Sequence, residues 1–141
     1  MSLLLKWCHL GGITLLQSEA GCAAQLPHAD YSSAVLHAAT EIGMKEKDCP
    51  LGAMFGFEDF TLDIWPGAML LKKKKNVTFR KQVVSIKEGQ LLLFRGDLVH
   101  AGSQYSSLNH RLHFYLDSSL CDRASDGTQH ITNGTYVNIS D

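Results

Sequence analysis

The feature that most constrains the fold is a series of short strand-like segments separated by turns. The segments are rich in leucine, β-branched and aromatic residues, which favour strands. They span residues 13–18, 51–58, 61–66, 77–86, 90–95 and 111–117. Turn signals such as Pro66-Gly67 and Gly96-Asp97 lie between them. This pattern predicts an all-β protein in which helix is a minor component.

The helical candidate is residues 32–43, "SSAVLHAATEIG". Ser32 or Ser33 can cap its first turn with a side-chain oxygen, because these residue types accept a hydrogen bond from a free backbone N–H. Gly43 can end it, since glycine readily adopts the left-handed conformation that often follows a helix.

Many short antiparallel strands in a chain of 141 residues close as a sandwich, a barrel or a jelly roll, because closure hides the sheet edges. We favour the jelly roll, whose mouth lets inward-pointing polar side chains meet a ligand. The length and the 45% hydrophobic content fit a single domain over residues 1–141. Residues 1–12 are predicted to be a lead-in and residues 119–141 a polar tail.

The charge balance disfavours polyanionic partners. Thirteen Lys and Arg oppose fourteen Asp and Glu, which gives a formal charge of −1. No overall field therefore attracts nucleic acid or an anionic membrane, and we expect neither as a partner. The lysine run 72–75 is interpreted as a solvated loop between strands.

The cysteine pattern and the N-terminus indicate a soluble protein. Four widely spaced cysteines without a CxxC pair predict free thiols in a reducing compartment; they are Cys8, Cys22, Cys49 and Cys121. Lys6 and His9 interrupt the N-terminal leucine run well short of a signal or membrane segment. We expect a cytoplasmic location, with a nuclear one left open.

"QLPHADY", residues 25–31, contains the first candidate ligands. In a strand, residues i and i+2 point to the same side, so His28 and Asp30 could offer a nitrogen and an oxygen to one ion. Pro27 fits a strand edge, where a ligand could enter. His100, in "FRGDLVHAGS", has the small neighbours Ala101 and Gly102 and is the third candidate.

Two imidazoles and a carboxylate leave up to three positions open on an octahedral ion, as in non-haem Fe(II) oxygenases. Each candidate alone has a simpler reading. A histidine in an apolar strand is often a hydrogen-bonded core residue, and Asp30 could cap the segment that begins at Ser32.

The segment 111–117, "RLHFYLD", predicts a polar face. Arg111, His113 and Tyr115 share one side of this strand, and Leu112, Phe114 and Leu116 share the other. A guanidinium can grip a carboxylate with two parallel hydrogen bonds, so Arg111 is a candidate for binding an anionic ligand.

Together "PHADY", "IWPGA", "VSIKEGQLLLFRGDLVHAGS" and "RLHFYLD" resemble the iron(II)- and 2-oxoglutarate-dependent dioxygenase superfamily, with its HxD…H…R signature. The resemblance runs from about residue 13 to 118 and implies a double-stranded β-helix, a cupin-like jelly roll. It also implies that His28, Asp30 and His100 ligate Fe(II) and that Arg111 binds the C5 carboxylate of 2-oxoglutarate.

Many members have a serine two residues after this arginine, as a second anchor for the carboxylate. Here that position is His113, with Tyr115 as the candidate substitute. The implied reaction decarboxylates 2-oxoglutarate to succinate and CO2, consumes O2 and hydroxylates a C–H bond of a further substrate. That substrate is left open between a protein side chain and a small molecule.

Two other functions stay open. A non-catalytic cupin-like domain could bind a metal or small molecule on the same barrel, and a structural interaction module is a third option. Family members usually carry helices before the barrel, whereas 27 residues precede His28 here. The chain is therefore expected to be a fragment, a splice form or a minimal core.

Some further residues are predicted to be structural. Trp7, Phe57 and Trp65 are interpreted as core residues, and Arg95 with Asp97 as a surface pair. The remaining histidines are interpreted as surface or packing residues; they are His9, His37, His110 and His130.

Overall fold

The computed structural model describes residues 8–69, 77–121, 123, 129–131 and 137–140. Trp7 and the lysine run 72–75 lie outside these residues. The strands are β1 (Cys8–Ser18), β2 (His28–Ala29), β3 (Leu51–Gly56), β4 (Phe60–Trp65), β5 (Val77–Arg80), β6 (Gln82–Ile86), β7 (Leu91–Arg95), β8 (Val99–Gly102), β9 (Asn109–Ser118), β10 (Gln129–His130) and β11 (Val137–Ser140). Helix α1 spans Ser33–Glu41, and a single 3-10 turn spans Glu46–Asp48.

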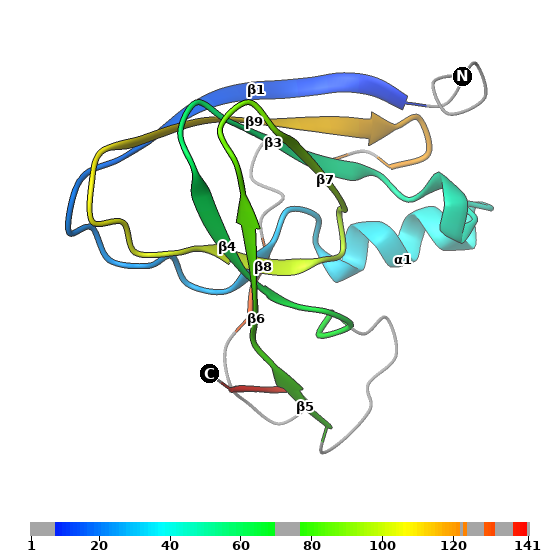
Figure 1. The fold of residues 1–141 in the computed structure, drawn as a ribbon. Coiled ribbons are helices and arrows are strands. Elements are labelled where there is room, and N and C mark those ends of the chain that lie inside the picture. Colours follow the sequence, from blue (N-terminus) through cyan, green and yellow to red (C-terminus); the bar gives the residue numbers. More distant parts are fainter. Residues whose placement is uncertain (1–7, 70–76, 122, 124–128, 132–136, 141) are drawn as a thin grey trace.

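Two antiparallel sheets face each other (Figure 1). One has the strand order β1-β9-β3-β7 and the other β10-β2-β8-β4-β6, while β11 and β5 form a separate parallel pair. Apart from the β4–β6 hairpin, successive strands of the two main sheets alternate between them, so the chain winds as a helix of strands. This is a double-stranded β-helix, and the predicted fold class is confirmed.

Helix α1 forms where its local signals predict it. The Ser32 side chain accepts a hydrogen bond from the Val35 backbone N–H at 3.2 Å, which satisfies a donor that the first turn leaves free. Gly43 follows the helix with φ of +106°, a conformation that costs glycine little. The inner side of α1 buries Leu36 and Ala39.

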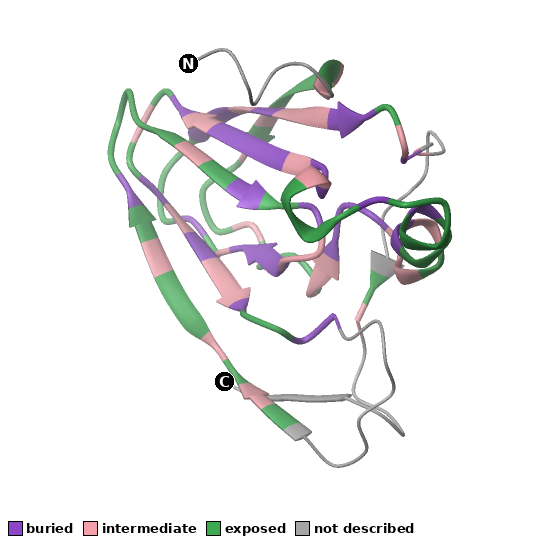
Figure 2. Cartoon of the chain, turned by 90° about the vertical axis from the view of Figure 1, so that its right-hand side faces the viewer, coloured by how far each residue is buried: buried purple, intermediate pink, exposed green. Residues whose placement is uncertain are grey.

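Most of the core lies on strands that face each other across the two sheets, and buried residues appear purple in Figure 2. One cluster joins the sheets and consists of Met54, Phe60, Leu62, Ile86, Phe94 and Tyr105. Trp65 is buried, as predicted. Phe57 is not: its exposed fraction is 45%, because it lies in the β3–β4 turn, where its ring makes a T-shaped contact with Phe55. The core prediction for Phe57 was wrong.

Three boundaries differ from the predicted ones. Strand β1 begins at Cys8, so pairing with β9 starts inside the predicted lead-in 1–12. The predicted strand 77–86 divides at Lys81, because β5 pairs with β11 while β6 pairs with β4. Strands β10 and β11 lie within the predicted tail 119–141. Each difference arises from pairing with a distant segment, which no local pattern specifies.

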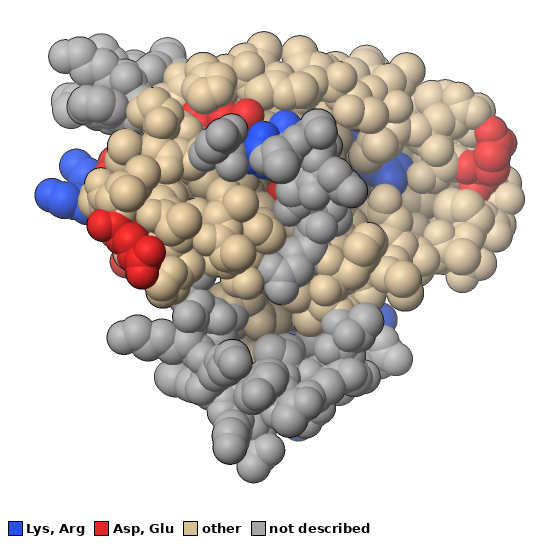
Figure 3. All heavy atoms as spheres, turned by 180° about the vertical axis from the view of Figure 1, so that it is seen from behind, with Lys and Arg blue, Asp and Glu red and all other residues tan. Residues whose placement is uncertain are grey.

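The face shown in Figure 3 is mostly uncharged, with a few acidic and basic side chains scattered over it. Arg95 contacts both Asp97 and Glu46 at 2.8 Å, which confirms the predicted surface pair and adds a third member. All four cysteines are free. The described residues contain no helix that could span a bilayer.

Candidate functional site

The three predicted metal ligands lie together inside the barrel. His28 is in β2, and it lies directly opposite His100 of the neighbouring strand β8, with ring centroids 4.6 Å apart. Asp30 follows β2, and one of its carboxylate oxygens is 3.7 Å from Nε2 of His100. One ligand atom from each of the three residues lies within 4.8 Å of the others. The fold thus brings together groups that are up to 72 positions apart in the chain.

Asp30 lies in this group, but its backbone is not in a strand as predicted. The strand ends at Ala29, and Asp30 lies in the bend that follows, so the alternation of a regular strand does not place it. Nor is Pro27 at a sheet edge, because β2 lies between β10 and β8. The Pro27 carbonyl accepts a hydrogen bond from the Ile131 backbone N–H at 2.8 Å, so this proline leads into an internal strand.

Both imidazoles are held in the same tautomer. Nδ1 of His28 lies 2.8 Å from the Leu26 carbonyl oxygen, and Nδ1 of His100 lies 3.0 Å from that of Leu98. A carbonyl can only accept, so Nδ1 carries the proton in each ring and Nε2 keeps its lone pair. Nε2 of His100 is fully buried and has no hydrogen-bond partner among the described residues. A buried nitrogen of this kind fits a metal ligand, since unpaired buried polar atoms are otherwise costly.

The electrostatics of the site favour a charged Asp30 and a neutral His100. Burial lowers the pKa of His100 to about 4, because removal from water disfavours the charged ring. Burial also disfavours the Asp30 carboxylate, but the hydrogen bond from His113 and the nearby imidazoles outweigh it and lower the pKa of Asp30. These are the protonation states that metal coordination needs.

Gly52 of β3 makes room for Asp30. A Cβ at this position would lie 2.8 Å from Oδ2 of Asp30 and 2.5 Å from the ring of Phe94. Because glycine has no Cβ, the strand backbone at position 52 can lie closer to the Asp30 carboxylate than it could with any other residue there.

Arg111 lies on the inner side of β9 and has an exposed fraction of 3%. Its Nη1 donates to the Ser18 hydroxyl and to the Asn109 side-chain oxygen, both at 3.1 Å, and its guanidinium lies 4.9 Å from the centre of the Tyr105 ring. Nε is buried without a partner, and in the described part of the chain no carboxylate lies within ion-pair distance of Arg111. Neutral groups thus hold the guanidinium in place, and no described residue compensates its charge.

The other two predicted anchors on β9 contact different partners. Nε2 of His113 lies 3.2 Å from Oδ2 of Asp30, so His113 belongs with the ligand group. The guanidinium carbon of Arg123 lies 3.7 Å from the centre of the Tyr115 ring, and this ring makes a T-shaped contact with Tyr31. The cosubstrate role of His113 and Tyr115 stays a prediction.

Sequence reasoning missed several neighbours of the site. Ser18, Tyr105 and Asn109 surround Arg111, and no spacing pattern signals them. His130 of β10 is exposed, as predicted, but it also lies opposite His28, with ring centroids 5.9 Å apart, which the sequence did not indicate. Only the pairing of β10 with β2 brings it there.

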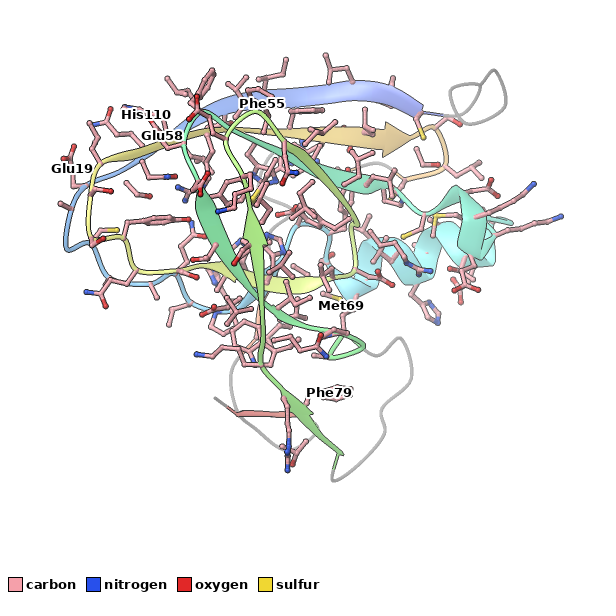
Figure 4. The ribbon with its side chains drawn as sticks, viewed as in Figure 1. Glu19, Phe55, Glu58, Met69, Phe79 and His110 are labelled. Atoms are coloured by element: carbon pink, nitrogen blue, oxygen red, sulfur yellow. The ribbon has the colours of Figure 1, made fainter. Side chains whose placement is uncertain are left out.

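The remaining histidines lie away from the ligand group. His9 and His37 are exposed, as predicted. His110 is partly buried, and its ring nitrogen lies 3.3 Å from a Glu58 carboxylate oxygen; both side chains are labelled at one end of the barrel in Figure 4.

No family model and no curated protein sequence matches the chain. Solved structures do resemble it. AviO1 from Streptomyces viridochromogenes Tue57 aligns with a TM-score of 0.62 and 13% identity, over 83% of this chain and 54% of AviO1. The fold is shared with known proteins.

Two further similar structures are enzymes of nogalamycin biosynthesis that are described as non-haem and α-ketoglutarate-dependent. The epimerase SnoN aligns with a TM-score of 0.59 and 14% identity, over 96% of this chain and 64% of SnoN. The carbocyclase SnoK aligns with a TM-score of 0.58 and 14% identity, over 82% of this chain and 53% of SnoK. The chain thus spans about half of AviO1 and of SnoK, and at these identities the likeness concerns the fold.

Proposed function

We propose that the chain is an Fe(II)- and 2-oxoglutarate-dependent oxygenase of the HxD…H…R type. The observation that carries this proposal is the group His28, Asp30 and His100, whose ligand atoms lie within 4.8 Å of one another inside a double-stranded β-helix. SnoN and SnoK support it, because both have this fold and are described as α-ketoglutarate-dependent.

In this proposal His28 and His100 donate neutral nitrogens and Asp30 donates a charged oxygen, which leaves up to three positions of an octahedral ion open. The bound iron would supply the activation of O2, coupled to decarboxylation of 2-oxoglutarate to succinate and CO2. The backbone carbonyls of Leu26 and Leu98 hold the two rings so that Nε2 faces the site. This arrangement also raises the basicity of the ligand nitrogens.

Arg111 would bind the far carboxylate of 2-oxoglutarate. A buried guanidinium without an anion is unfavourable, and the cosubstrate would supply the missing charge. Ser18 and Asn109 already fix one side of the guanidinium. The Arg111 side chain therefore loses less conformational entropy when the ligand binds. Gly102 of β8 leaves space there, since a Cβ would lie 3.2 Å from Nη2 of Arg111.

The oxidised substrate is proposed to be a C–H bond of a protein side chain or of a small molecule. The formal charge of −1 argues against a nucleic-acid partner, and the four free thiols are compatible with a cytoplasmic protein. The chain is proposed to act as one domain over residues 1–141.

The metal is tested first. Metal-free parent protein is titrated with Mn(II), followed by electron paramagnetic resonance, alongside His100→Ala and the control His37→Ala, which removes an exposed histidine from α1. We expect the parent and the control to bind equally and His100→Ala to lose at least about tenfold in affinity, because one of three ligands is gone. Equal affinities of all three proteins would exclude the proposed ligand set.

Turnover is tested next. Fe(II)-loaded parent is incubated with 2-oxoglutarate in air, and succinate is measured against a chelator-treated sample and against His100→Ala. Succinate above both controls is expected even without the oxidised substrate, since this chemistry can run uncoupled. Binding of metal and 2-oxoglutarate without any succinate would instead support the non-catalytic cupin-like domain.

A further inference from the structure

We propose that His113 is a positioning residue for Asp30: it holds one carboxylate oxygen so that the other faces the metal site. This inference rests on the proposed function and assigns a role to the position at which the resembled family places a second cosubstrate anchor.

The two oxygens of Asp30 have different neighbours. Oδ2 lies 3.2 Å from Nε2 of His113, and Oδ1 lies 3.7 Å from Nε2 of His100. A carboxylate can only accept, so Nε2 of His113 carries the proton and donates it in the hydrogen bond. With Oδ2 engaged, Oδ1 is the oxygen that faces Nε2 of His100, and rotation of the carboxylate would break a buried hydrogen bond.

His113 is well suited to hold a fixed position. It lies in the middle of β9, between Thr14 of β1 and Met54 of β3, and its exposed fraction is 7%. Its ring stacks on Phe94, with centroids 6.3 Å apart and planes inclined by 25°, and contacts Tyr115 at a centroid distance of 4.7 Å. Packing on two aromatic rings within a central strand limits the rotamers that the imidazole can adopt.

The same contact argues against His113 as a cosubstrate anchor. In this geometry the Nε2–H donor of His113 is used by Asp30. Arg111 still has a free donor, since its buried Nε has no hydrogen-bond partner among the described residues. The cosubstrate carboxylate is therefore assigned to Arg111, and His113 to the metal ligand.

Two polar substitutions separate these roles. In His113→Gln the side-chain amide can place an N–H near the position of Nε2, whereas in His113→Asn the amide ends near the position of Nδ1 and cannot reach Oδ2. A third variant, His113→Phe, keeps an aromatic ring without any donor. Each metal-free variant is first compared with the parent by thermal unfolding, so that the Gln and Asn pair remains informative even if His113→Phe does not fold.

The readouts are the Mn(II) dissociation constant and, separately, the 2-oxoglutarate dissociation constant of Mn(II)-saturated protein. We expect His113→Asn and His113→Phe to bind Mn(II) about 10- to 100-fold more weakly, the usual effect of losing a group that orients a ligand. His113→Gln should recover most of the affinity. The affinity of the metal-saturated variants for 2-oxoglutarate should stay within about twofold of the parent.

Two results would overturn the inference while leaving the proposed function intact. One is Mn(II) affinity that is equal in the parent and in His113→Asn. The other is unchanged Mn(II) affinity with weakened 2-oxoglutarate binding, which would make His113 a cosubstrate anchor. A parent protein that binds no Mn(II) at all would remove the proposed function and this inference together.

Discussion

The two faces of strand β9 have opposite chemistry. The inner face carries Arg111, His113 and Asp117, which are all buried, and the outer face carries Leu112, Phe114 and Leu116, which are only partly buried. In most antiparallel sheets the apolar face is the one that packs on the core. In β9 the polar face is the buried one, because the space between the two sheets holds a polar site at this strand.

Each polar residue of the inner face has its own partner. Arg111 is held by Ser18 and Asn109, His113 contacts Asp30, and Asp117 accepts hydrogen bonds from Tyr31 and Arg123. Buried polar groups are stable only when such partners exist. Each position of the inner face therefore requires a particular side chain, because each contacts a different partner.

The outer face is apolar over most of the sheet, and Arg95 of β7, which pairs with Leu51, interrupts it. The residues that pair with Leu112, Phe114 and Leu116, and the β7 residues beyond them, continue the face; they are Leu10, Ile13 and Leu15 of β1, Leu51, Ala53 and Phe55 of β3, and Leu91 and Leu93 of β7. Leu15 and Leu93 have exposed fractions of 60% and 52%. Apolarity alone does not mark the interior of this protein, and substitutions on the two faces should have very different effects.

The largest expected effect is on ligand binding at the inner face. Arg111→Ala should weaken 2-oxoglutarate binding to Mn(II)-loaded protein by about 2–5 kcal/mol, the usual cost of removing one partner of a buried charge pair. Arg111→Lys should weaken 2-oxoglutarate binding by less than Arg111→Ala does, because an ammonium keeps the charge but cannot form the two-pronged contact. Calorimetric titration measures both, with Arg95→Ala as the control at an exposed arginine. Identical dissociation constants for Arg111→Ala and the parent would place the cosubstrate elsewhere.

The next effect concerns packing just inside the sheet. Met54 of β3 has an exposed fraction of 3% and pairs with His113. Met54→Ala should lower the free energy of unfolding by about 2–5 kcal/mol, because it removes buried methylene groups and leaves a cavity. Urea unfolding of the metal-free protein measures this change. A loss below 1 kcal/mol would mean that the interior is loosely packed at this point.

A pH-dependent effect should follow from the buried His100. Its folded pKa of about 4 lies below the unfolded value of 6.5, so between these pH values the unfolded chain binds more protons than the folded one. The free energy of unfolding is therefore unaffected by His100 above about pH 6.5. It decreases as the pH drops toward 4, by up to about 3 kcal/mol.

Urea unfolding of chelator-treated protein at pH 7 and pH 5 measures this loss, and His100→Gln should reduce it. Asp30 does not oppose the effect in this window, because its pKa is lowered from 3.8 and its contribution is lost only at still lower pH. A pH dependence that is the same in the parent and in His100→Gln would assign the loss to other groups.

The smallest effect is expected on the outer face. Leu93→Ala should cost less than about 1 kcal/mol, because half of this side chain is already in water and no cavity forms. The measurement is the same urea unfolding as for Met54→Ala, with which it forms a matched pair across the sheet. A loss as large as that of Met54→Ala would show that the outer face is covered in solution.

The sequence by itself determined the elements of this protein. Alternating and β-branched runs predicted most of the strands, and Ser32 and Gly43 marked the ends of α1, because these signals act on the backbone within a few residues. It also predicted which residues of β9 share a face, since side chains alternate in any strand. The candidates His28, Asp30, His100 and Arg111 were found the same way, from residue type and spacing.

Only the tertiary structure decided how these groups meet. The register of β2 against β8 puts His28 opposite His100, the bend after Ala29 turns Asp30 inward, and β10 brings His130 beside His28. The sequence likewise left His113 as a second anchor, whereas the packing of β9 directs it to Asp30. Strand register and the choice of the inner face depend on contacts between distant segments, so no local pattern contains them.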